Sequence, residues 1–502
     1  MPDEKSFTLC EAETQVYSPF AEGHPMRLPK NKSAFTRMAC IFLFCMTMPP
    51  VLPAQTLNRL HAFDLTDGEY PYGLVQGADG SLYGTTEDGG AFGYGSIFSI
   101  TPLGRLTTLY SFCSGGCTDG AYPTGTLIQS PDGDFYGTTW GGGATGQGTV
   151  FKINTSGVLT TLYTFCLNGL YHCTDGSGPF AGLVQATDGN FYGTTQAGGT
   201  VFKITPSGKL TTLHHLAIRE GSNPFAPLVQ ASDGNLYGTT EQDGAYGGGT
   251  IFRITPGGTL TTIYNFCSLS NCADGYGPDA GLIQATDGNL YGTTNGRRTF
   301  SGTVFKITLG GTLTTLHNFC SLTNCADGAY PESPLVQGND GNFYSTTAGL
   351  YIGSIFEITP DGNFTTLYDF SCSHHWGCLN GDGPDAMILH TNGKFYGTAI
   401  TGGIPDSCSP TGCGTVFSLD TGLQPFVETL PTSGKVGESV KIIGTNLKGA
   451  TAVMFNQIPT SFTVMSSTAI RATVPAGAST GAVQVVTPSG PLASITPFTV
   501  RP

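Results

Sequence analysis

Apolar and β-branched residues come in runs of four to seven along most of the chain, separated by turns rich in Gly, Pro and Asp. One representative stretch holds four such runs, at residues 73–76, 81–86, 96–100 and 106–112. Short runs of this composition between turn residues are typical of β-strands, and no stretch beyond the N-terminal region has a helical period. We name the four runs strands a, b, c and d.

The four-strand unit occurs seven times. Its marker is Tyr-Gly-Thr-Thr or a close variant in strand b, which begins at Tyr83, Tyr136, Tyr192, Tyr237, Tyr291, Tyr344 and Tyr396, at intervals of 45 to 56 residues. A period of this size is typical of repeat architectures. Strands a and b are joined by Asp-Gly in six units and by Asn392-Gly393 in the seventh, and such dipeptides favour tight hairpins.

The two ends of the repeat decide between a ring and a linear array. Residues 57–63 precede the first unit and match its strand d, residues 106–112, whereas the last unit, residues 387–419, has no clear strand d. Pairing the spare strand with the incomplete unit would close a ring and remove exposed sheet edges. We therefore predict an all-β fold, with a seven-bladed β-propeller of four-stranded blades over residues 55–422, closed by its N-terminal strand.

A second pattern of short strands and turns follows over residues 425–502. Apolar runs at 440–447, 452–456, 469–475 and 483–488 predict an immunoglobulin-like β-sandwich. The segments 431–434 (Pro-Thr-Ser-Gly), 444–447 (Gly-Thr-Asn-Leu) and 474–477 (Val-Pro-Ala-Gly) resemble the IPT/TIG domain. The resemblance implies a spacer or interaction module and no role in nucleic-acid binding.

The repeat unit also resembles a known family. Its pattern of Gly-Leu-Val-Gln, Asp-Gly-Asn-Leu-Tyr-Gly-Thr-Thr and Gly-Thr-Val-Phe-Lys-Ile-Thr-Pro is similar to the Gloeobacter/Verrucomicrobia ("GloVer") tandem repeat. The last unit departs from the pattern, with Asn392 in place of Asp and Ala399 in place of the second Thr. The resemblance implies an exported bacterial protein and assigns no catalytic residue.

Cysteine usage predicts an oxidising compartment. Twelve of the fifteen cysteines form close pairs along the chain: Cys113 with Cys117, Cys166 with Cys173, Cys267 with Cys272, Cys320 with Cys325, Cys372 with Cys378, and Cys408 with Cys413. A structural zinc needs four ligands, and each pair lacks a His at ligand spacing. We therefore predict six local disulfides, which persist outside the cytoplasm, and no metal at these cysteines.

The N-terminal region predicts export. A basic stretch from Arg27 to Arg37 precedes an apolar core at 38–46, which is too short for a membrane span, and Ala54 offers a small residue for cleavage. We interpret residues 1–54 as a leader and signal peptide, with Met26 as the true start and a mature chain beginning near Gln55. The expected product is secreted or held at the cell surface, without a transmembrane anchor.

Charge narrows the range of partners. Only 11% of residues are charged and the formal net charge is −14, which disfavours nucleic acid because its binding needs clustered Lys and Arg. We predict a monomer whose partner is an extracellular protein or glycan, and no cofactor. Calcium is the one alternative, because seven loop acids each precede Gly and hard oxygen ligands suit calcium: Asp67, Asp119, Asp175, Glu220, Asp274, Asp327 and Asp382.

The b–c and d–a loops share one face of a propeller and are long and variable here, so we expect the ligand on that face. The residue after the strand-b motif varies between units, as a specific pocket requires. We predict ligand contacts at five of these positions: Glu87, Trp140, Gln196, Glu241 and Asn295. Trp140 would be the anchor, stacking on a sugar or a partner side chain, with a hydrogen bond from Glu87. A tolerant surface loop is the alternative interpretation.

Other recurring residues predict packing. His61, His214 and His317 occupy a strand-d position that holds Tyr in four other units. A glutamine recurs in strand a of six units, where it would bond neighbouring blades or line the channel: Gln76, Gln129, Gln185, Gln230, Gln284 and Gln337.

The function predicted from these patterns is extracellular binding or cell-surface interaction, with no enzymatic activity. Two alternatives remain open: a carbohydrate-active lyase or hydrolase, and a purely structural envelope protein. Catalysis would require paired carboxylates or a His/Glu pair at a pocket, and Glu87 and Glu241 belong to units on opposite sides of the predicted ring.

Overall fold

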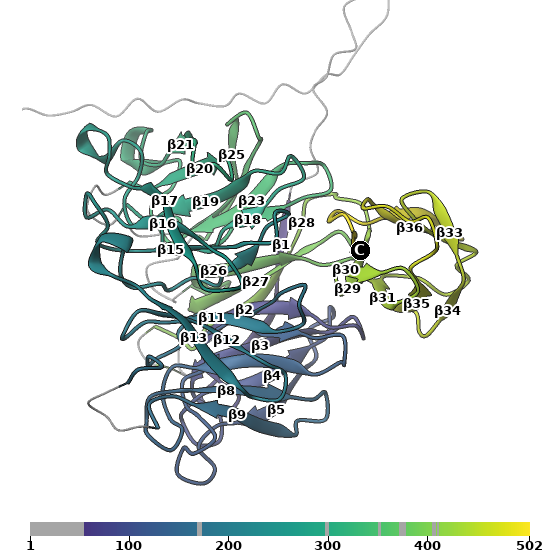
Figure 1. The fold of residues 1–502 in the computed structure, drawn as a ribbon, viewed down its shortest axis with the longest axis horizontal. Helices are drawn as coiled ribbons and strands as arrows, with labels where there is room; N and C mark the ends of the chain where they lie inside the picture. The colour runs from purple at the N-terminus through teal and green to yellow at the C-terminus, as the bar shows by residue number, and fades with distance from the viewer. Residues whose placement is uncertain are drawn as a thin grey trace, which may run out of the picture. The chain divides into compact units, whose positions relative to one another are not determined.

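The computed structural model describes residues 55–501, except 168–172, 297–300, 350–352, 371–377, 404–407 and 409–410 (Figure 1). The leader, the predicted signal peptide and Cys372 lie outside the described residues. The described part of the chain is almost entirely β, with three 3-10 turns: η1 (Ile218–Glu220), η2 (Ser270–Cys272) and η3 (Thr323–Cys325). None of its helices has the length and apolar character that a membrane span requires.

Seven antiparallel sheets of four strands form the propeller, and six of them use strands that are consecutive in the chain. The first three blades are β2 (Glu69–Gln76), β3 (Leu82–Asp88), β4 (Ser96–Ile100) and β5 (Leu106–Ser111); β6 (Ile128–Gln129), β7 (Phe135–Thr139), β8 (Thr149–Ile153) and β9 (Leu159–Thr164); and β10 (Val184–Gln185), β11 (Phe191–Thr195), β12 (Thr200–Ile204) and β13 (Leu210–His215). The next three are β14 (Val229–Gln230), β15 (Leu236–Thr240), β16 (Thr250–Ile254) and β17 (Leu260–Asn265); β18 (Ile283–Gln284), β19 (Leu290–Thr294), β20 (Thr303–Ile307) and β21 (Leu313–Asn318); and β22 (Val336–Gln337), β23 (Phe343–Thr347), β24 (Ser354–Ile358) and β25 (Phe364–Asp369).

The seventh blade joins the two ends of the repeat, in the order β1-β28-β27-β26. It contains β26 (Asp382–Leu389), β27 (Phe395–Thr401), β28 (Thr415–Asp420) and β1 (Thr56–Ala62). β1 pairs antiparallel with β28, from Thr56 opposite Asp420 to Ala62 opposite Thr415, and Figure 1 shows the purple β1 beside the green β28. The prediction of a seven-bladed propeller closed by its N-terminal strand is confirmed.

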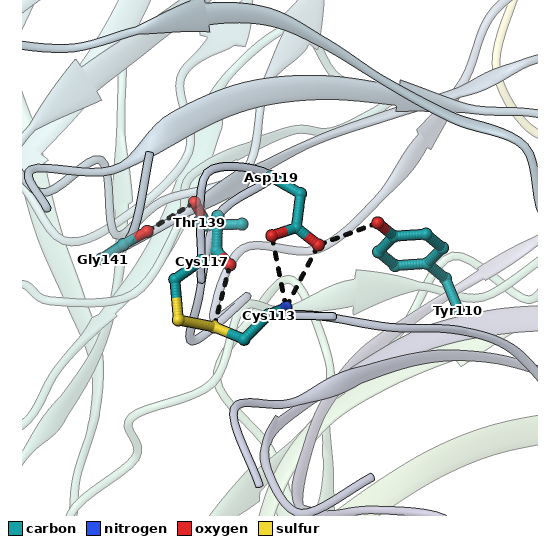
Figure 2. Close-up of a disulfide and its surroundings, with 7 residues drawn as sticks. Tyr110, Cys113, Cys117, Asp119, Thr139 and Gly141 are labelled. Atoms are coloured by element: carbon teal, nitrogen blue, oxygen red, sulfur yellow. Dashed lines mark hydrogen bonds between the residues drawn. A yellow bond between two sulfur atoms is a disulfide. The ribbon is translucent and has the colours of Figure 1, made fainter. Parts of the chain in front are cut away.

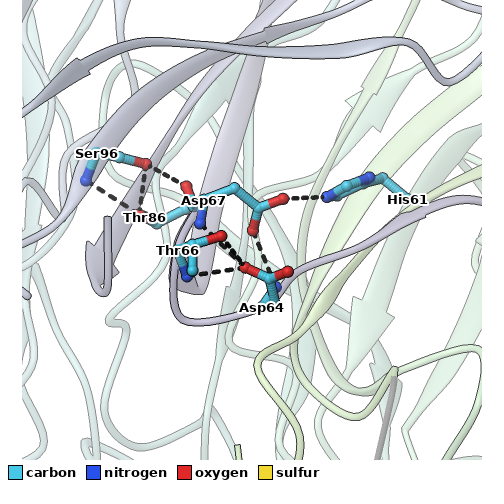
Figure 3. A network of polar contacts seen from close by, with 6 residues as sticks. All are labelled: His61, Asp64, Thr66, Asp67, Thr86 and Ser96. Carbon is cyan, nitrogen blue, oxygen red and sulfur yellow. Dashed lines mark hydrogen bonds and ion pairs between the residues drawn. The ribbon is translucent and has the colours of Figure 1, made fainter. Parts of the chain in front are cut away.

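Closure continues into the packing between blades 7 and 1. Phe63, which follows β1, is fully buried in one cluster with Leu74 and Phe98 of blade 1 and Val416 of blade 7. In Figure 3 a polar network adds to this contact: the His61 ring nitrogen lies 2.8 Å from a carboxylate oxygen of Asp67, whose backbone oxygen accepts the Ser96 hydroxyl at 2.8 Å. The closing strand is therefore tied to the blade that follows it.

The strand-b motif is explained by contacts within and between blades. In six units the motif Tyr donates to the turn Asp four residues earlier, as Tyr192 does to Asp188 at 2.8 Å. In four units its ring lies against a Phe of the next blade, as Tyr136 does on Phe191 at 4.2 Å between centroids. The second Thr bonds the first residue of strand c, as in Thr139 to Thr149 at 2.8 Å. These side chains are repeated because each blade needs the same contacts.

The strand-a glutamines bond neighbouring blades, as predicted. In five of the seven blade pairs the side-chain oxygen accepts the backbone N–H of the residue that is second after strand a in the preceding blade: Ala78 to Gln129, Thr187 to Gln230, Ser232 to Gln284, Thr286 to Gln337 and Thr391 to Gln76, at 2.8–3.0 Å. Blade 2 has Pro131 at the donor position, which carries no N–H, and blade 7 has Leu389 in place of the glutamine. Both exceptions follow directly from the sequence.

Strand a differs in length between blades, which the sequence analysis did not anticipate. It has eight residues in β2 and β26 and two in the other five blades. Two residues separate Pro71 from Leu74, and two separate Pro384 from Met387, whereas the other units have three at this place, as between Pro123 and Leu127. In blades 1 and 7 the shorter connection keeps the first half of strand a paired with strand b. In the other five blades the extra residue interrupts this pairing.

The structure joins five of the predicted cysteine pairs within their own loops: Cys113 with Cys117, Cys166 with Cys173, Cys267 with Cys272, Cys320 with Cys325, and Cys408 with Cys413. The sixth predicted pair differs, because only one of its members is described. Cys378 is disulfide-bonded, but its predicted partner Cys372 lies outside the described residues. The bond between Cys372 and Cys378 therefore stays a prediction.

Figure 2 shows the disulfide of the first pair and the contacts around it. Asp119 accepts the Cys113 backbone N–H at 3.1 Å and the Tyr110 hydroxyl at 2.8 Å. The acidic loop residue therefore fixes the loop to the end of strand d.

The second cysteine of a pair also holds the turn that follows it. The carbonyl groups of Cys173 and Cys378 accept the N–H of the Gly three residues later, at 3.1 and 3.0 Å. The pair in the last b–c loop is placed differently, because Cys413 is fully buried between blades 7 and 1. Its carbonyl accepts the Tyr70 N–H of blade 1 at 3.0 Å. This pair therefore contributes to ring closure as well as to its own loop, which the sequence analysis did not foresee.

The C-terminal part is a β-sandwich with its own core. One sheet has the order β29 (Val427–Leu430), β31 (Ser439–Gly444), β35 (Ala469–Thr473) and β34 (Phe462–Val464); the other has β33 (Ile458–Thr460), β32 (Ala452–Phe455), β36 (Val483–Thr487) and β37 (Gly490–Ala493); and β30 (Ser433–Lys435) pairs with β38 (Thr499–Arg501). Ile442, Val453, Ile470 and Val485 are buried between the sheets, as expected for an immunoglobulin-like fold.

Candidate functional site

The indole of Trp140 follows β7 and lies in a surface pocket of about 470 Å³. Loops of blades 2, 3 and 4 form this pocket, which we call the Trp140 pocket, and its polar side chains are Gln147, Ser177, Gln196 and Asn223. Trp140 is 44% exposed, and its indole N–H donates to the side-chain oxygen of Gln196 at 3.2 Å. Two of the five predicted contact residues are thus brought together by adjacent blades.

Two glycines at this site leave room for aromatic rings to pack against the backbone. A Cβ on Gly178 would lie 3.1 Å from the Trp140 indole nitrogen, and one on Gly141 would lie 3.1 Å from the ring of Tyr122. Tyr122 and Trp140 meet edge to face at 6.1 Å between centroids, and Tyr94 meets Tyr122 in the same way at 5.7 Å. Tyr94, Tyr122 and Trp140 form an aromatic row across the loops of blades 1 and 2.

Tyr122 has an uncommon backbone conformation. Its φ is 59°, in the left-handed region, and the residue before the repeated Pro has positive φ in all seven units. Three units place Gly at this position (Gly178, Gly277 and Gly383), three place Tyr (Tyr70, Tyr122 and Tyr330) and one places Asn223. A non-glycine residue in this region costs about 1 kcal/mol or more, so the Tyr122 ring occupies a position where Gly would fit the backbone better.

The other predicted contact residues have partners elsewhere. Glu87 accepts a hydrogen bond from the Tyr72 hydroxyl of its own blade at 3.0 Å, and burial raises the pKa of its carboxyl group. Glu241 is buried and accepts from the Gln242 amide at 3.3 Å. In the structure Glu87 thus has a partner inside blade 1, and its hydrogen bond to a ligand at Trp140 stays a prediction.

Asn295 is fully buried and donates to Asp279 at 2.7 Å. Asp279 follows the repeated Pro of its unit, and so does Tyr72, the partner of Glu87. This position is highly variable between units, and we call its seven residues the axial set: Tyr72, Thr124, Phe180, Phe225, Asp279, Glu332 and Asp385. Glu87 and Asn295 thus support members of the axial set.

The axial set converges across blades. The ring of Phe180 lies 6.3 Å from that of Tyr72 and 5.4 Å from that of Phe225, centroid to centroid. Burial, with a further contribution from the nearby charge of Glu332, raises the pKa of Asp385 to about 7. This set was not predicted, although the residue after the repeated Pro varies between units in the same way as the residue after strand b.

The acidic loop residues cap the end of strand d. His214 lies 2.8 Å from Glu220, and the Tyr163 hydroxyl donates to Asp175 at 2.9 Å. In the last unit Asn380 takes this role by donating to the Tyr368 hydroxyl, so Asp382 is not the equivalent residue that the sequence analysis assumed. Within the described residues, no group of three or more His, Cys, Asp or Glu is placed to hold a metal ion.

Comparison with protein families gives two matches. The Gloeobacter/Verrucomicrobia repeat matches residues 50–200 and 196–417, and the IPT/TIG domain matches residues 425–500. The chain belongs to the Gloeobacter/Verrucomicrobia repeat family. The resemblance noted in the sequence is confirmed for the repeat and for the C-terminal domain. No curated protein matches the chain.

Solved structures with the same kind of fold share little sequence with this repeat protein. A streptogramin B lyase has a TM-score of 0.50 at 18% identity, covering 73% of this chain and 97% of its own. Virginiamycin B lyase from Staphylococcus aureus, with quinupristin, has 0.50 at 17%, covering 73% and 99%. A fungal alcohol oxidase in complex with copper has 0.53 at 12%, covering 89% and 100%. At these identities the likeness concerns the fold alone.

Proposed function

We propose that the protein is an exported binding protein that takes an extracellular ligand on the face formed by the b–c and d–a loops. The observation that carries the proposal is the Trp140 pocket, in which a 44% exposed indole is oriented by a hydrogen bond to Gln196. Exposed aromatic side chains at a pocket with a few fixed polar groups are typical of binding sites.

The scaffold supports this function. Disulfides pin several of the loops on this face, and such bonds persist in oxidising compartments. A rigid propeller with variable loops positions contacts without a large ordering cost on binding. Membership of the Gloeobacter/Verrucomicrobia repeat family supports export, the first part of the proposal.

An extracellular lyase or hydrolase is the alternative class, and two of the solved structures of this fold are lyases. Such an enzyme would need two titratable groups facing one ligand. The predicted carboxylates Glu87 and Glu241 stand in blades 1 and 4 and have separate partners, Tyr72 and Gln242. These two carboxylates therefore do not form the pair that catalysis requires.

The test is a binding panel of immobilised neutral polysaccharides, acidic polysaccharides, peptidoglycan and extracellular matrix proteins. We expect at least one class to bind, and Trp140→Ala to weaken that binding at least tenfold with a nearly unchanged Tm. Leu103→Ala is the matched control, because Leu103 is 94% exposed in the turn between β4 and β5, on the opposite face. Binding that survives Trp140→Ala, or binding to no class at all, would contradict the proposal.

A further inference from the structure

The aromatic row and the Trp140 pocket form one continuous surface. Tyr94 and Trp140 are 39% and 44% exposed, and Tyr122 lies between them in edge-to-face contact with both. The backbone follows the same path, because Tyr122 donates its N–H to the Tyr94 carbonyl at 3.0 Å and accepts the Trp140 N–H at 2.9 Å. The row is therefore rigidly spaced.

The polar side chains of the Trp140 pocket are uncharged, whereas Asp88 and Glu87 place negative charge near Tyr122 in the aromatic row. Among the described residues that line the Trp140 pocket no side chain is ionisable, although the whole chain has a formal net charge of −14. Gln147, Gln196 and Asn223 contribute carboxamides, and each carboxamide can both donate and accept hydrogen bonds. A charged ligand would find no partner of opposite sign in the pocket.

A pyranose ring matches both the aromatic surface and the uncharged polar side chains of the pocket. One of its faces presents C–H groups, which the negative face of an aromatic ring attracts, and its rim presents hydroxyl groups, which both donate and accept. Trp140 keeps its indole oriented without a ligand, because Gln196 holds its N–H and Gly178 leaves room for the ring. Such preorganisation reduces the entropy lost on binding.

Tyr122 links the two exposed rings. Its backbone has a conformation that three other units assign to Gly and two others to Tyr (Tyr70 and Tyr330), and its ring stands between those of Tyr94 and Trp140. The ring extends the aromatic surface from one subsite at Trp140 toward a second at Tyr94.

We propose that the Trp140 pocket and the aromatic row bind an uncharged pyranose oligosaccharide, with one sugar stacked on Trp140 and the chain continuing over Tyr122 toward Tyr94. The inference rests on the proposed function, since it names the ligand class of the same face. It assigns Trp140 and Tyr122 to stacking, and Gln196 to orienting the indole.

The test is calorimetric titration of the full chain with cellohexaose, xylohexaose and mannohexaose, and with an alginate hexamer as the charged comparison. We expect at least one neutral hexamer to bind and the alginate hexamer not to bind. Trp140→Ala should lower the affinity at least tenfold and Gln196→Ala by a smaller factor. Tyr246→Ala is the matched control, because Tyr246 is 61% exposed on a b–c loop of blade 4 and outside the pocket.

Tyr122→Gly separates binding from packing. The substitution places at Tyr122 the residue that three other units use, so we expect the Tm to stay the same or rise while the affinity for the hexamer falls several-fold. A lower Tm with unchanged affinity would assign Tyr122 to packing and overturn the extended site.

The outcomes distinguish the two proposals. A polymer that is charged or proteinaceous, and whose binding depends on Trp140, would overturn the oligosaccharide class and leave the binding face in place. A neutral hexamer that binds equally well to Trp140→Ala would overturn the site. Binding of no hexamer and of no polymer in the earlier panel would overturn both.

Discussion

At the scale of single residues, the structure shows why some positions repeat and others do not. Residues that contact the neighbouring blade, such as Tyr192 and Thr194, recur because every blade needs them. Residues after strand b and after the repeated Pro vary because they face the loops or the axial set. The sequence therefore identified Trp140 and Gln196 as variable, but their hydrogen bond depends on the spacing of two blades in space, which no pattern along the chain contains.

Asp385 carries the prediction that belongs to this scale. Its folded-state pKa of about 7 lies above the ordinary value of 3.8, because burial disfavours the charged carboxylate. A carboxyl group with a raised pKa favours folding in its protonated form, so its effect turns unfavourable as pH rises from about 4 to about 7.

We therefore expect Asp385→Asn to be more stable than the natural protein at pH 8 and closest to it at pH 4. Urea unfolding at several pH values measures the difference in the free energy of unfolding. A difference that stays constant across this range would show that the carboxyl group titrates normally in the folded protein. Asp361→Asn, at an exposed carboxyl group in the turn between β24 and β25, is the control.

At the scale of elements, the strand order could be predicted because each unit has the same four runs and the same turns. The length of strand a could not, since it depends on whether two or three residues follow the repeated Pro, as between Pro71 and Leu74. The hydrogen bonds that strand-a glutamines make between blades, which we call the glutamine ladder, were predicted only as a type of contact. The two blade pairs that lack the bond could not be predicted, because the position of the N–H donor was not known.

The glutamine ladder gives a matched pair of variants. Gln230 accepts the Thr187 N–H from the preceding blade at 2.8 Å, whereas Gln185 faces the position of Pro131, which has no N–H, and donates within its own blade to Gly189 at 3.3 Å. We expect Gln230→Leu to lower the free energy of unfolding by about 1 kcal/mol more than Gln185→Leu. Equal losses in chemical denaturation would show that the inter-blade bond contributes nothing.

The loop disulfides act at the same scale. Each closes a short loop, so the replacement of Cys113 and Cys117 by Ser should lower the free energy of unfolding by about 2 kcal/mol through the entropy of the unfolded chain. Non-reducing peptide mapping of the exported protein should recover the six pairs within their own loops, including Cys372 with Cys378. Bridges between blades, or free thiols throughout, would contradict the pairing.

At the scale of the whole molecule, the pairing of β1 with β28 turns seven blades into a closed ring. The ends of the repeat predicted this pairing because the strand missing from the last unit is present before the first. The C-terminal sandwich has its own buried core, and its family could be predicted from short motifs alone. The resemblances to the repeat and IPT/TIG families are the predictions that the comparisons confirm most directly.

Deletion of residues 57–63 should therefore damage folding far more than removal of residues 425–502. The first change exposes the edge of β28 and uncovers the cluster around Leu74 and Val416, whereas the second removes strands that have a separate core. Size-exclusion chromatography and thermal unfolding compare the two truncated proteins. A monomeric first truncation that melts like the natural protein would contradict the role of β1 in closure.

Because β1 comes first in the chain and β28 comes near the end of the repeat, the ring has a built-in order of assembly. During synthesis the first six blades can form from strands that follow one another, but the seventh must wait until Asp420 has emerged and can meet Thr56. Until then β1 has no partner strand, and the growing ring stays open at both ends. A circular permutant in which residues 55–63 follow β28 would make all seven blades local, and would be expected to refold faster with little change in stability.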